Sequence, residues 1–356
     1  MRRRTFLESG VAATAIGLAG CSANPVDDDD ADDDTLAVAT YGSFVDAPSD
    51  SPGEWIKDEF EERHDVTLEW HTPDQEINYY IERHNEDVGI EPELYLGFSP
   101  HELVRVDRNT EGELFTEWDE GGLEHADDVD EEFYFDPQDR ALPTYSSYCA
   151  IVYDGRTVAE PETFEDLLDP EYEGQIALSN PQEGTTGLLF LLWTIDQFGE
   201  EGYLDYWEAL LENDVRILDS WGDVYTQFEE EEVPVIVSYS NDRVYAERDG
   251  NDLEKHRVSL LNDEAYANVS GMGRFADGTN DELAHEFADF VLSPEVQAVI
   301  AERNVTGPVN TETDLPEVYE EYAQIPDDPV FFDYDELDEN LETWLDGWSD
   351  VVAGGR

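Results

Sequence analysis

The chain has 356 residues, of which 90 are Asp or Glu and only 18 are Lys or Arg, so its formal net charge is -72. A surface of that sign is repelled by nucleic acid and by anionic lipid, which makes both poor partners of the bare chain. Hydrophobic residues make up 40% of the chain and include 8 Trp, 18 Tyr and 16 Phe, a content typical of a globular protein with a large core.

So much like charge works against a compact state at ordinary ionic strength, because the carboxylates repel one another. In concentrated salt the Debye length falls to ~3 Å or less, and this repulsion is screened. The composition resembles that of halophilic archaeal proteins. That resemblance implies that most individual carboxylates belong to a salt-adapted surface and not to a site.

The first 21 residues have the order of a secretory signal. Arginines at 2–4 precede an apolar run at 10–18, which is too short to span a membrane, and small residues lead to Cys21. The paired arginines resemble a twin-arginine export signal, and residues 18–21 resemble a lipoprotein box. We therefore expect Cys21 to be lipidated and to hold the exported chain at the outer face of the cytoplasmic membrane, the cell surface. An uncleaved anchor helix is the alternative.

Residues 22–34 read as a tether. They contain two runs of aspartate, at 27–30 and 32–34, with nothing to bury, so we expect an extended, disordered spacer. Metal binding by the aspartates is the less favoured alternative. The folded body is expected to begin at Thr35, and roughly 320 residues favour two lobes.

Strands and helices alternate along this body, as in an α/β protein. The expected helices cover residues 53–64, 77–84, 187–198, 203–211, 281–292, 294–303 and 336–352. The expected strands cover residues 36–41, 66–71, 93–98, 141–153, 175–178, 215–218, 233–240 and 258–261.

Motifs of common catalytic sites do not occur in the sequence. There is no G-x-S-x-G elbow, no H-E-x-x-H zinc motif, no Walker phosphate loop and no paired C-x-x-C. The seven histidines are scattered, and we expect none of them among the turns that end strands. Cys149 lies in an apolar strand pattern and is interpreted as a buried hydrophobic residue. We therefore predict that the protein is not an enzyme and holds no cofactor or metal.

Aromatic and small polar residues gather where the expected strands end. The segments are 41–44, 96–99, 180–187, 219–223 and 237–241. In open α/β sheets, ligands bind beyond the carboxyl ends of the strands. We expect these turns to converge on one cleft.

These segments resemble those of thiamine-binding solute-binding proteins of ABC importers. The matching segments, in chain order, are 39–44, 94–97, 142–145 with 152–154, 180–193, 220–225 and 237–245. The resemblance covers essentially the whole body and implies an α/β, two-lobed fold of the periplasmic-binding-protein type II class, with a ligand cleft between the lobes. It implies a first lobe of residues 35–142 plus 271–356 and a second lobe of 143–270.

The resemblance also implies a site for thiamine, a cation with two flat rings. Its carboxylate would accept from the aminopyrimidine, its aromatic residues would stack on the rings, and its turn would meet a hydroxyl or phosphate. Glu183 adds negative charge to that turn and a glycine replaces a hydroxyl residue there, which weakens the expectation of a phosphate ester. Val305 stands where relatives carry an aromatic residue. The implied ligand-binding residues are Tyr41, Asp74, Gly184, Thr185, Trp221, Tyr239 and Tyr245.

Each of these residues also has a structural reading: the aromatic residues as core and Asp74 as salt-adapted surface. As a whole, the sequence predicts a monomeric, lipid-anchored receptor that closes on thiamine or its phosphate ester and delivers it to a membrane permease. A receptor for Fe(III) or a polyamine, or a secreted hydrolase on the same frame, are the alternatives. Asn268 and Asn304 begin glycosylation sequons.

Overall fold

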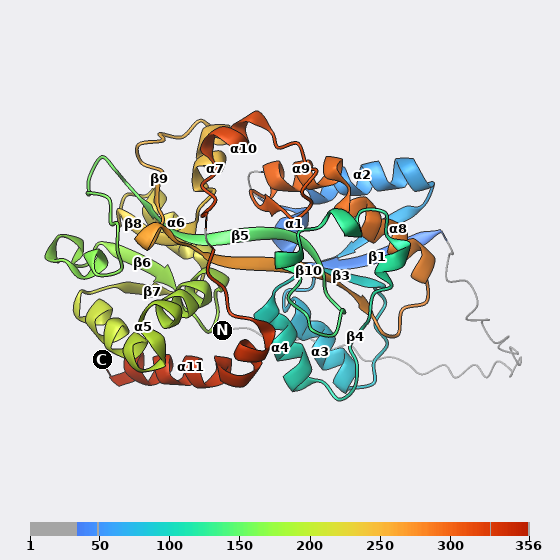
Figure 1. Ribbon diagram of the computed structural model, residues 1–356, viewed down its shortest axis with the longest axis horizontal. Coiled ribbons are helices and arrows are strands. Elements are labelled where there is room, and N and C mark those ends of the chain that lie inside the picture. The colour runs from blue at the N-terminus through green and yellow to red at the C-terminus, as the bar shows by residue number, and fades with distance from the viewer. Residues whose placement is uncertain (1–33, 48–49, 328, 355–356) are drawn as a thin grey trace, which may run out of the picture. The chain divides into compact units, whose positions relative to one another are not determined.

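In the computed structural model, two long antiparallel strands, β5 (Leu142–Tyr153) and β10 (Tyr266–Phe275), run through the middle of the folded body (Figure 1). The structure describes residues 34–47, 50–327 and 329–354. The predicted export signal, the lipidation at Cys21 and the tether up to residue 33 lie outside the described residues.

Strands and helices alternate as the sequence predicts. The other strands are β1 (Thr35–Thr40), β2 (Thr67–His71), β3 (Leu94–Phe98), β4 (Phe115–Thr116), β6 (Ile176–Ser179), β7 (Arg216–Leu218), β8 (Val235–Tyr239), β9 (Arg257–Ser259) and β11 (Gly307–Pro308). The α-helices are α1 (Gly42–Val45), α2 (Gly53–His64), α3 (Ile77–Asn85), α4 (Pro100–Asn109), α5 (Thr185–Glu212), α6 (Trp221–Glu229), α7 (Asp242–Asp249), α8 (Asp281–Leu292), α9 (Pro294–Arg303), α10 (Glu317–Tyr322) and α11 (Tyr334–Gly354).

The two long strands join two half-sheets. In the first half-sheet, β2, β1 and β3 are parallel, and β10 adds to β3 in the antiparallel sense through residues 271–274. In the second, β5 pairs with β8 through residues 149–153, and β8, β6 and β7 continue in parallel. Strand β10 therefore belongs to the first half-sheet through one of its ends, and β5 belongs to the second half-sheet in the same way. The pairing of β5 with β10 connects the two half-sheets.

Helices cover both faces of the second half-sheet, because alternate residues of a strand point to opposite sides. Cys149 and Ile151 of β5 pack with the apolar side chains of α5, whereas Ala150 and Val152 pack with those of α6. Cys149 is fully buried, as the sequence predicts, and burial raises the pKa of its thiol.

The first half-sheet is covered in the same way. Leu36 and Val38 of β1 face a cluster that includes Phe60 of α2 and Phe287 of α8. Residues of the opposite face, among them Tyr95, join a cluster with the buried side of α3 and α4. Figure 1 shows α3 and α4 on one side of this half-sheet and α2, α8 and α9 on the other.

The C-terminal segment contacts both halves. Helix α10 packs on α7, and α11 runs along both α4 and α5 (Figure 1). Arg108 of α4 binds Asp338 of α11 at 2.9 Å, and the hydroxyl of Tyr203 in α5 donates to the carbonyl of Trp344 at 3.1 Å. The lobe bounds that the sequence indicates stay a prediction.

Most of the expected elements are found. Strand β10 and helices α1, α4, α6, α7 and α10 are additional to the expected ranges, and two of the expected regions differ in extent. The helices expected at 187–198 and 203–211 form one element, α5, interrupted at Gly199, where φ is 71°. The strand expected at 258–261 is wrong at its end: β9 stops at Ser259, and Leu261 begins a 3₁₀ turn in which Asn262 has a φ of 59°. Within the described parts of the chain, no helix combines the length and the apolar character needed to span a membrane.

Candidate ligand site

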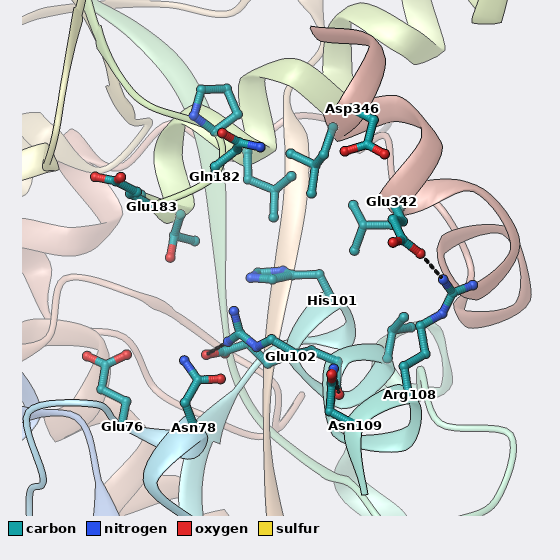
Figure 2. A pocket seen from close by; sticks show the side chains of 18 residues that line it. Glu76, Asn78, His101, Glu102, Arg108, Asn109, Gln182, Glu183, Glu342 and Asp346 are labelled. Carbon is teal, nitrogen blue, oxygen red and sulfur yellow. Dashed lines mark hydrogen bonds and ion pairs between the residues drawn. The ribbon is translucent and has the colours of Figure 1, made fainter. Parts of the chain in front are cut away.

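A cavity of about 830 Å³ opens between the two half-sheets and α11 (Figure 2). One wall is the start of α3 and α4, which follow strands of the first half-sheet. The opposite wall is the turn 181–185, which joins β6 to α5 in the second half-sheet. The turns after β3 and β6 thus face one another, as expected for a ligand site at the carboxyl ends of parallel strands.

The turn into α5 is shaped by two glycines. A Cβ on Gly187 would lie 1.9 Å from the carbonyl oxygen of Ser179, and one on Gly184 would lie 2.6 Å from the Ser179 hydroxyl. The Ser179 hydroxyl accepts from the N–H of Gly187 at 2.8 Å, so the helix starts directly against the end of β6. Gly184 and Thr185 therefore line the cavity at the first turn of α5, and the Thr185 side chain is exposed.

The first turn of α4 is fixed by a capping box. The backbone N–H and the hydroxyl of Ser99 both donate to the carboxylate of Glu102 at 2.9 Å, which satisfies the helix N-terminus. This arrangement places His101 and Glu102 on the cavity wall. Burial lowers the pKa of His101 to about 4, so the ring is neutral at neutral pH.

A carboxylate of the turn before α3 also lines the cavity. Glu76 has a φ of 51°, and burial and the charge of Glu102 raise its pKa. Asp74, two residues earlier on the same turn, does not line the cavity, and both residues are partly exposed to solvent. Of the two, Glu76 is the one the structure brings to the cleft.

Beside the cavity, Tyr41 closes β1 with a hydrogen-bonded cluster. The Tyr145 hydroxyl donates to the Tyr41 hydroxyl at 3.0 Å, and the Tyr41 hydroxyl donates to the Asn304 side-chain oxygen at 3.3 Å. Burial raises the pKa of Tyr41 to about 12; its two hydrogen bonds oppose the rise, and the charges of Glu76 and Glu102 add to it.

An aromatic group stands at the strand ends of the second half-sheet. The ring of Trp221 lies 4.9 Å from that of Tyr225 and 6.4 Å from that of Tyr239, centroid to centroid. The Trp221 indole N–H donates to the hydroxyl of Ser238 at 3.0 Å, yet the residue is 39% exposed. Part of the Trp221 ring is therefore accessible from the solvent.

Tyr225 connects this group to Tyr245. Their rings meet edge to face at 6.0 Å, and the Tyr225 hydroxyl donates to Asp242 at 2.7 Å. The guanidinium carbon of Arg248 lies over the ring of Tyr245, 5.4 Å from its centroid. Sequence reasoning treated Tyr225 as part of a helix start, and the structure makes it the link between two predicted site residues.

The predicted site residues thus fall into separate places. Gly184 and Thr185 line the cavity, Tyr41 lies beside it, and Trp221, Tyr239 and Tyr245 belong to the aromatic group. Their roles as ligand contacts stay predictions.

Most residues that line the cavity were missed by the sequence reasoning, among them Glu76, His101 and Glu102. The expectation that no histidine lies at the cleft turns is wrong, because the capping motif of α4 carries His101 into the wall. The Ser-x-x-Glu pattern before α4 is the signal that would have found it.

The two sequons lie in folded surroundings. Asn268 sits in β10 and is 9% exposed. The Asn304 amide nitrogen lies 3.0 Å from the Tyr41 hydroxyl, and the next residue, Val305, has a φ of 54°, which is rare for a β-branched side chain. Neither amide is presented on an open surface loop.

Comparison with known proteins places the chain in a family. Residues 102–339 match the family model described as bacterial extracellular solute-binding protein. The chain belongs to this family. It is an extracytoplasmic solute-binding receptor of the ABC-transporter kind, and it is not an enzyme.

Individual relatives are more distant. A thiamine-binding periplasmic protein of Brucella suis is 24% identical over 321 residues, which cover 88% of this chain and 91% of that protein. Iron uptake protein A1 of Synechocystis is 24% identical over 355 residues, with 87% of each chain covered. A solved periplasmic thiamin binding protein superposes with a TM-score of 0.76 at 23% identity, over 89% of this chain and 96% of that one. The predicted two-lobed periplasmic-binding-protein fold is confirmed.

Proposed function

We propose that this receptor captures thiamine between its two lobes and delivers it to a membrane permease. The observation that carries the proposal is the partly exposed Trp221 ring, which packs at tilted angles beside Tyr225 and Tyr239 at the strand ends of the second half-sheet. Thiamine-binding proteins among the relatives support the same ligand. Thiamine and its phosphate esters share both rings, so the aromatic group alone does not separate them.

The aromatic group suits a flat organic cation. A positive ring over the face of Trp or Tyr is attracted by the ring quadrupole, at about 0.5–2 kcal/mol per contact. Trp221 is partly exposed, its N–H is bonded to Ser238, and its ring packs beside Tyr225. The ring is therefore held in one orientation before a ligand arrives, which lowers the entropic cost of binding.

A carboxylate is proposed to orient the ligand by accepting from its exocyclic amine. The sequence resemblance favours Asp74 for this role, and the position of Glu76 on the cavity wall favours Glu76. Both residues belong to one turn, so a modest turn rearrangement on closure would exchange them. Variants of each residue decide between them.

Closure is proposed to bend β5 and β10, which are the strands common to both half-sheets. Ligand contacts from both sides would then stabilise the closed state over the open one. Residues 35–142 with 271–356, and residues 143–270, are the proposed lobes. Helix α10 contacts α7, and α11 contacts α5. On closure, α10 and α11 would either move together with the second lobe or exchange these contacts for new ones.

The anchoring is proposed from the sequence: export through the twin-arginine signal, lipidation at Cys21 and an acidic tether. A net charge of -72 also favours an environment of concentrated salt, where self-repulsion is screened. We propose that the receptor acts as a monomer beside its permease.

Calorimetric titration of the purified protein with thiamine, in about 2 M KCl to screen the surface charge, tests the proposal. We expect saturable binding of one thiamine, weakened about tenfold in Trp221→Ala by loss of the cation–π contact. Phe331→Ala is the matched control, since Phe331 is an exposed aromatic residue (54%) that does not belong to the aromatic group around Trp221. Loss of affinity in Glu76→Gln but not in Asp74→Asn assigns the carboxylate; absence of thiamine binding by the folded protein overturns the proposal.

An Fe(III) receptor is the second candidate. The adjacent hydroxyls of Tyr41 and Tyr145 favour it, as does the iron uptake relative. Burial raises the pKa of both phenols, which opposes the tyrosinate form that binds iron. An intense visible absorption band on addition of ferric citrate, lost in Tyr41→Phe, would identify an iron receptor. Heat released with spermidine and not with thiamine would identify a polyamine receptor instead.

A further inference from the structure

The charge around the cavity bears on the chemical form of the ligand. We infer that this receptor selects unphosphorylated organic cations and rejects their phosphate esters, because the cavity that faces the turn before α5 has an excess of carboxylates, and both of its arginines are ion-paired with carboxylates. The choice of thiamine as probe rests on the proposed function, whereas the sign of the charge in the cavity does not.

Acidic residues outnumber basic ones around this cavity. Two arginines, Arg105 and Arg108, line it. The acidic residues come from the turn before α3, from α4, from the turn before α5 and from α11, and so they surround the space on several sides (Figure 2). They are Glu76, Glu102, Glu183, Glu342 and Asp346.

Both arginines are already bound to carboxylates. Arg105 lies 3.2 Å from Glu102. Arg108 binds Asp338 at 2.9 Å and Glu342 at 3.2 Å, and Figure 2 shows the second pair at the α11 side of the cavity. Burial keeps the third basic group, His101, neutral at neutral pH by lowering its pKa to about 4. Among the described residues that line the cavity, each arginine therefore has its charge balanced by a carboxylate, although the Arg105 Nε has no hydrogen-bond partner.

The turn before α5 offers backbone N–H groups, but it also carries a charge of the wrong sign for phosphate. The N–H of Gly187 is already donated to Ser179. The side chain of Glu183, one residue before Gly184, is exposed, and it lines the same cavity. A phosphate set against Gly184 and Thr185 would therefore lie beside the Glu183 carboxylate.

A hydroxyl group at this place meets no such penalty. It brings no charge, and it needs only one donor or acceptor, which Thr185 or the turn backbone supplies. A phosphate ester brings about -1.5 to -2 charges at neutral pH. Like charges brought together in a partly desolvated site repel strongly, and the positively charged thiazolium ring of thiamine gains from the same carboxylates. The cavity therefore distinguishes thiamine from its phosphate esters at the end of the ligand that carries either the hydroxyl or the phosphate.

The first experiment measures the charge of the cavity without any ligand. Gln182→Cys places a thiol on the cavity wall, and its rates of reaction with a cationic and an anionic methanethiosulfonate reagent are compared. Val88→Cys, at an exposed position outside the cavity, corrects for the net charge of the whole protein, and the parent chain gives the background. We expect the cationic-to-anionic rate ratio to be about tenfold higher in the cavity, and Glu183→Gln to lower it. A ratio no higher than at Val88→Cys overturns the inference.

The second experiment compares thiamine and thiamine monophosphate by calorimetry on the same protein. We expect the monophosphate to bind about tenfold more weakly or worse, and the combined Glu183→Gln and Glu342→Gln variant to narrow the gap. Equal or tighter binding of the monophosphate by the parent overturns the inference. If thiamine fails to bind while the reagent ratio stays high, the proposed function falls and the charge selection of the cavity stands.

Discussion

The hydroxyl oxygens of Tyr41 and Tyr145 lie 3.0 Å apart, which ties the end of β1 to the long strand β5. The amide of Asn304 completes the contact, with its nitrogen 3.0 Å from the Tyr41 hydroxyl. The three side chains come from distant parts of the chain and meet beside the cavity. This cluster connects the first half-sheet, a strand common to both half-sheets and the turn after α9.

Removing the central hydroxyl with Tyr41→Phe is expected to lower the free energy of unfolding by about 1–2 kcal/mol, because two buried polar groups each lose a partner. Urea unfolding in concentrated salt measures the change. If the loss of stability is absent while thiamine affinity falls, the hydroxyl serves the ligand and not the fold. No change in either quantity would contradict a role for the cluster.

Gly97 is expected to tolerate no side chain. Its φ is 101°, and a Cβ there would lie 2.5 Å from the Tyr145 hydroxyl and 2.6 Å from a ring carbon of Tyr41. Gly97→Ala should therefore destabilise the fold by more than about 2 kcal/mol through strain and displacement of both rings. Gly42→Ala is the matched control, since a Cβ on Gly42 meets nothing within 4 Å, and it should be neutral or slightly stabilising. Equal effects in thermal unfolding would contradict this.

Element boundaries were predictable where local chemistry marks them. Helix α2 occupies Gly53–His64, as predicted; it begins after Pro52 and ends where Asp65 adopts a left-handed conformation. The break in α5 falls at Gly199, the residue that follows the first predicted helix. The two-residue strands β4 and β11 were not predicted, because they exist only through pairing with β10 and β5. Two residues are too few to show the alternation of apolar and polar side chains by which a strand is recognised in a sequence.

The site was predictable in outline for a similar reason. The turns after β3 and β6 meet because carboxyl ends of parallel strands share an edge, which any α/β pattern implies. Which of Asp74 and Glu76 lines the cavity could not be predicted from the sequence. The direction of each side chain depends on a turn in which Glu76 has a φ of 51°. In a chain with 90 acidic residues, no single carboxylate stands out by type alone.

Arg140 is expected to be among the most sensitive charged residues. It bonds Asp107 at 2.7 Å and Asp136 at 3.0 Å, and the Asp136 side chain is fully buried. Tyr334, at the start of α11, donates to the same Asp107. Arg140→Ala leaves a buried carboxylate unpaired and should lower the free energy of unfolding by about 3–5 kcal/mol.

The control is Arg257→Ala, which removes an exposed pair with Glu254 and should change stability by less than about 1 kcal/mol. Chemical unfolding of both variants in the same salt gives the comparison. Similar small effects would show that the Asp136 carboxylate finds water or takes up a proton when its partner is removed.

His101 should make stability depend on pH. Burial lowers its pKa from 6.5 to about 4, so the unfolded chain takes up a proton at a higher pH than the folded chain does. Its contribution to the free energy of unfolding is therefore fully present above about pH 6.5 and is lost as the pH falls towards 4. Because the ring is partly exposed, we expect the loss to be about 1–3 kcal/mol.

Comparison of the parent with His101→Asn isolates this contribution, because the titration of the many carboxylates is common to both. Between pH 7 and pH 4 the parent should lose about 1–3 kcal/mol more than the variant, since only the parent carries an imidazole whose pKa is lowered in the folded state. Titration of the His101 ring signals by NMR provides the independent check on the folded protein. An equal loss in parent and variant, or a ring that takes up its proton near pH 6.5, would mean that water reaches His101 through the open cavity and that the wall is not desolvated.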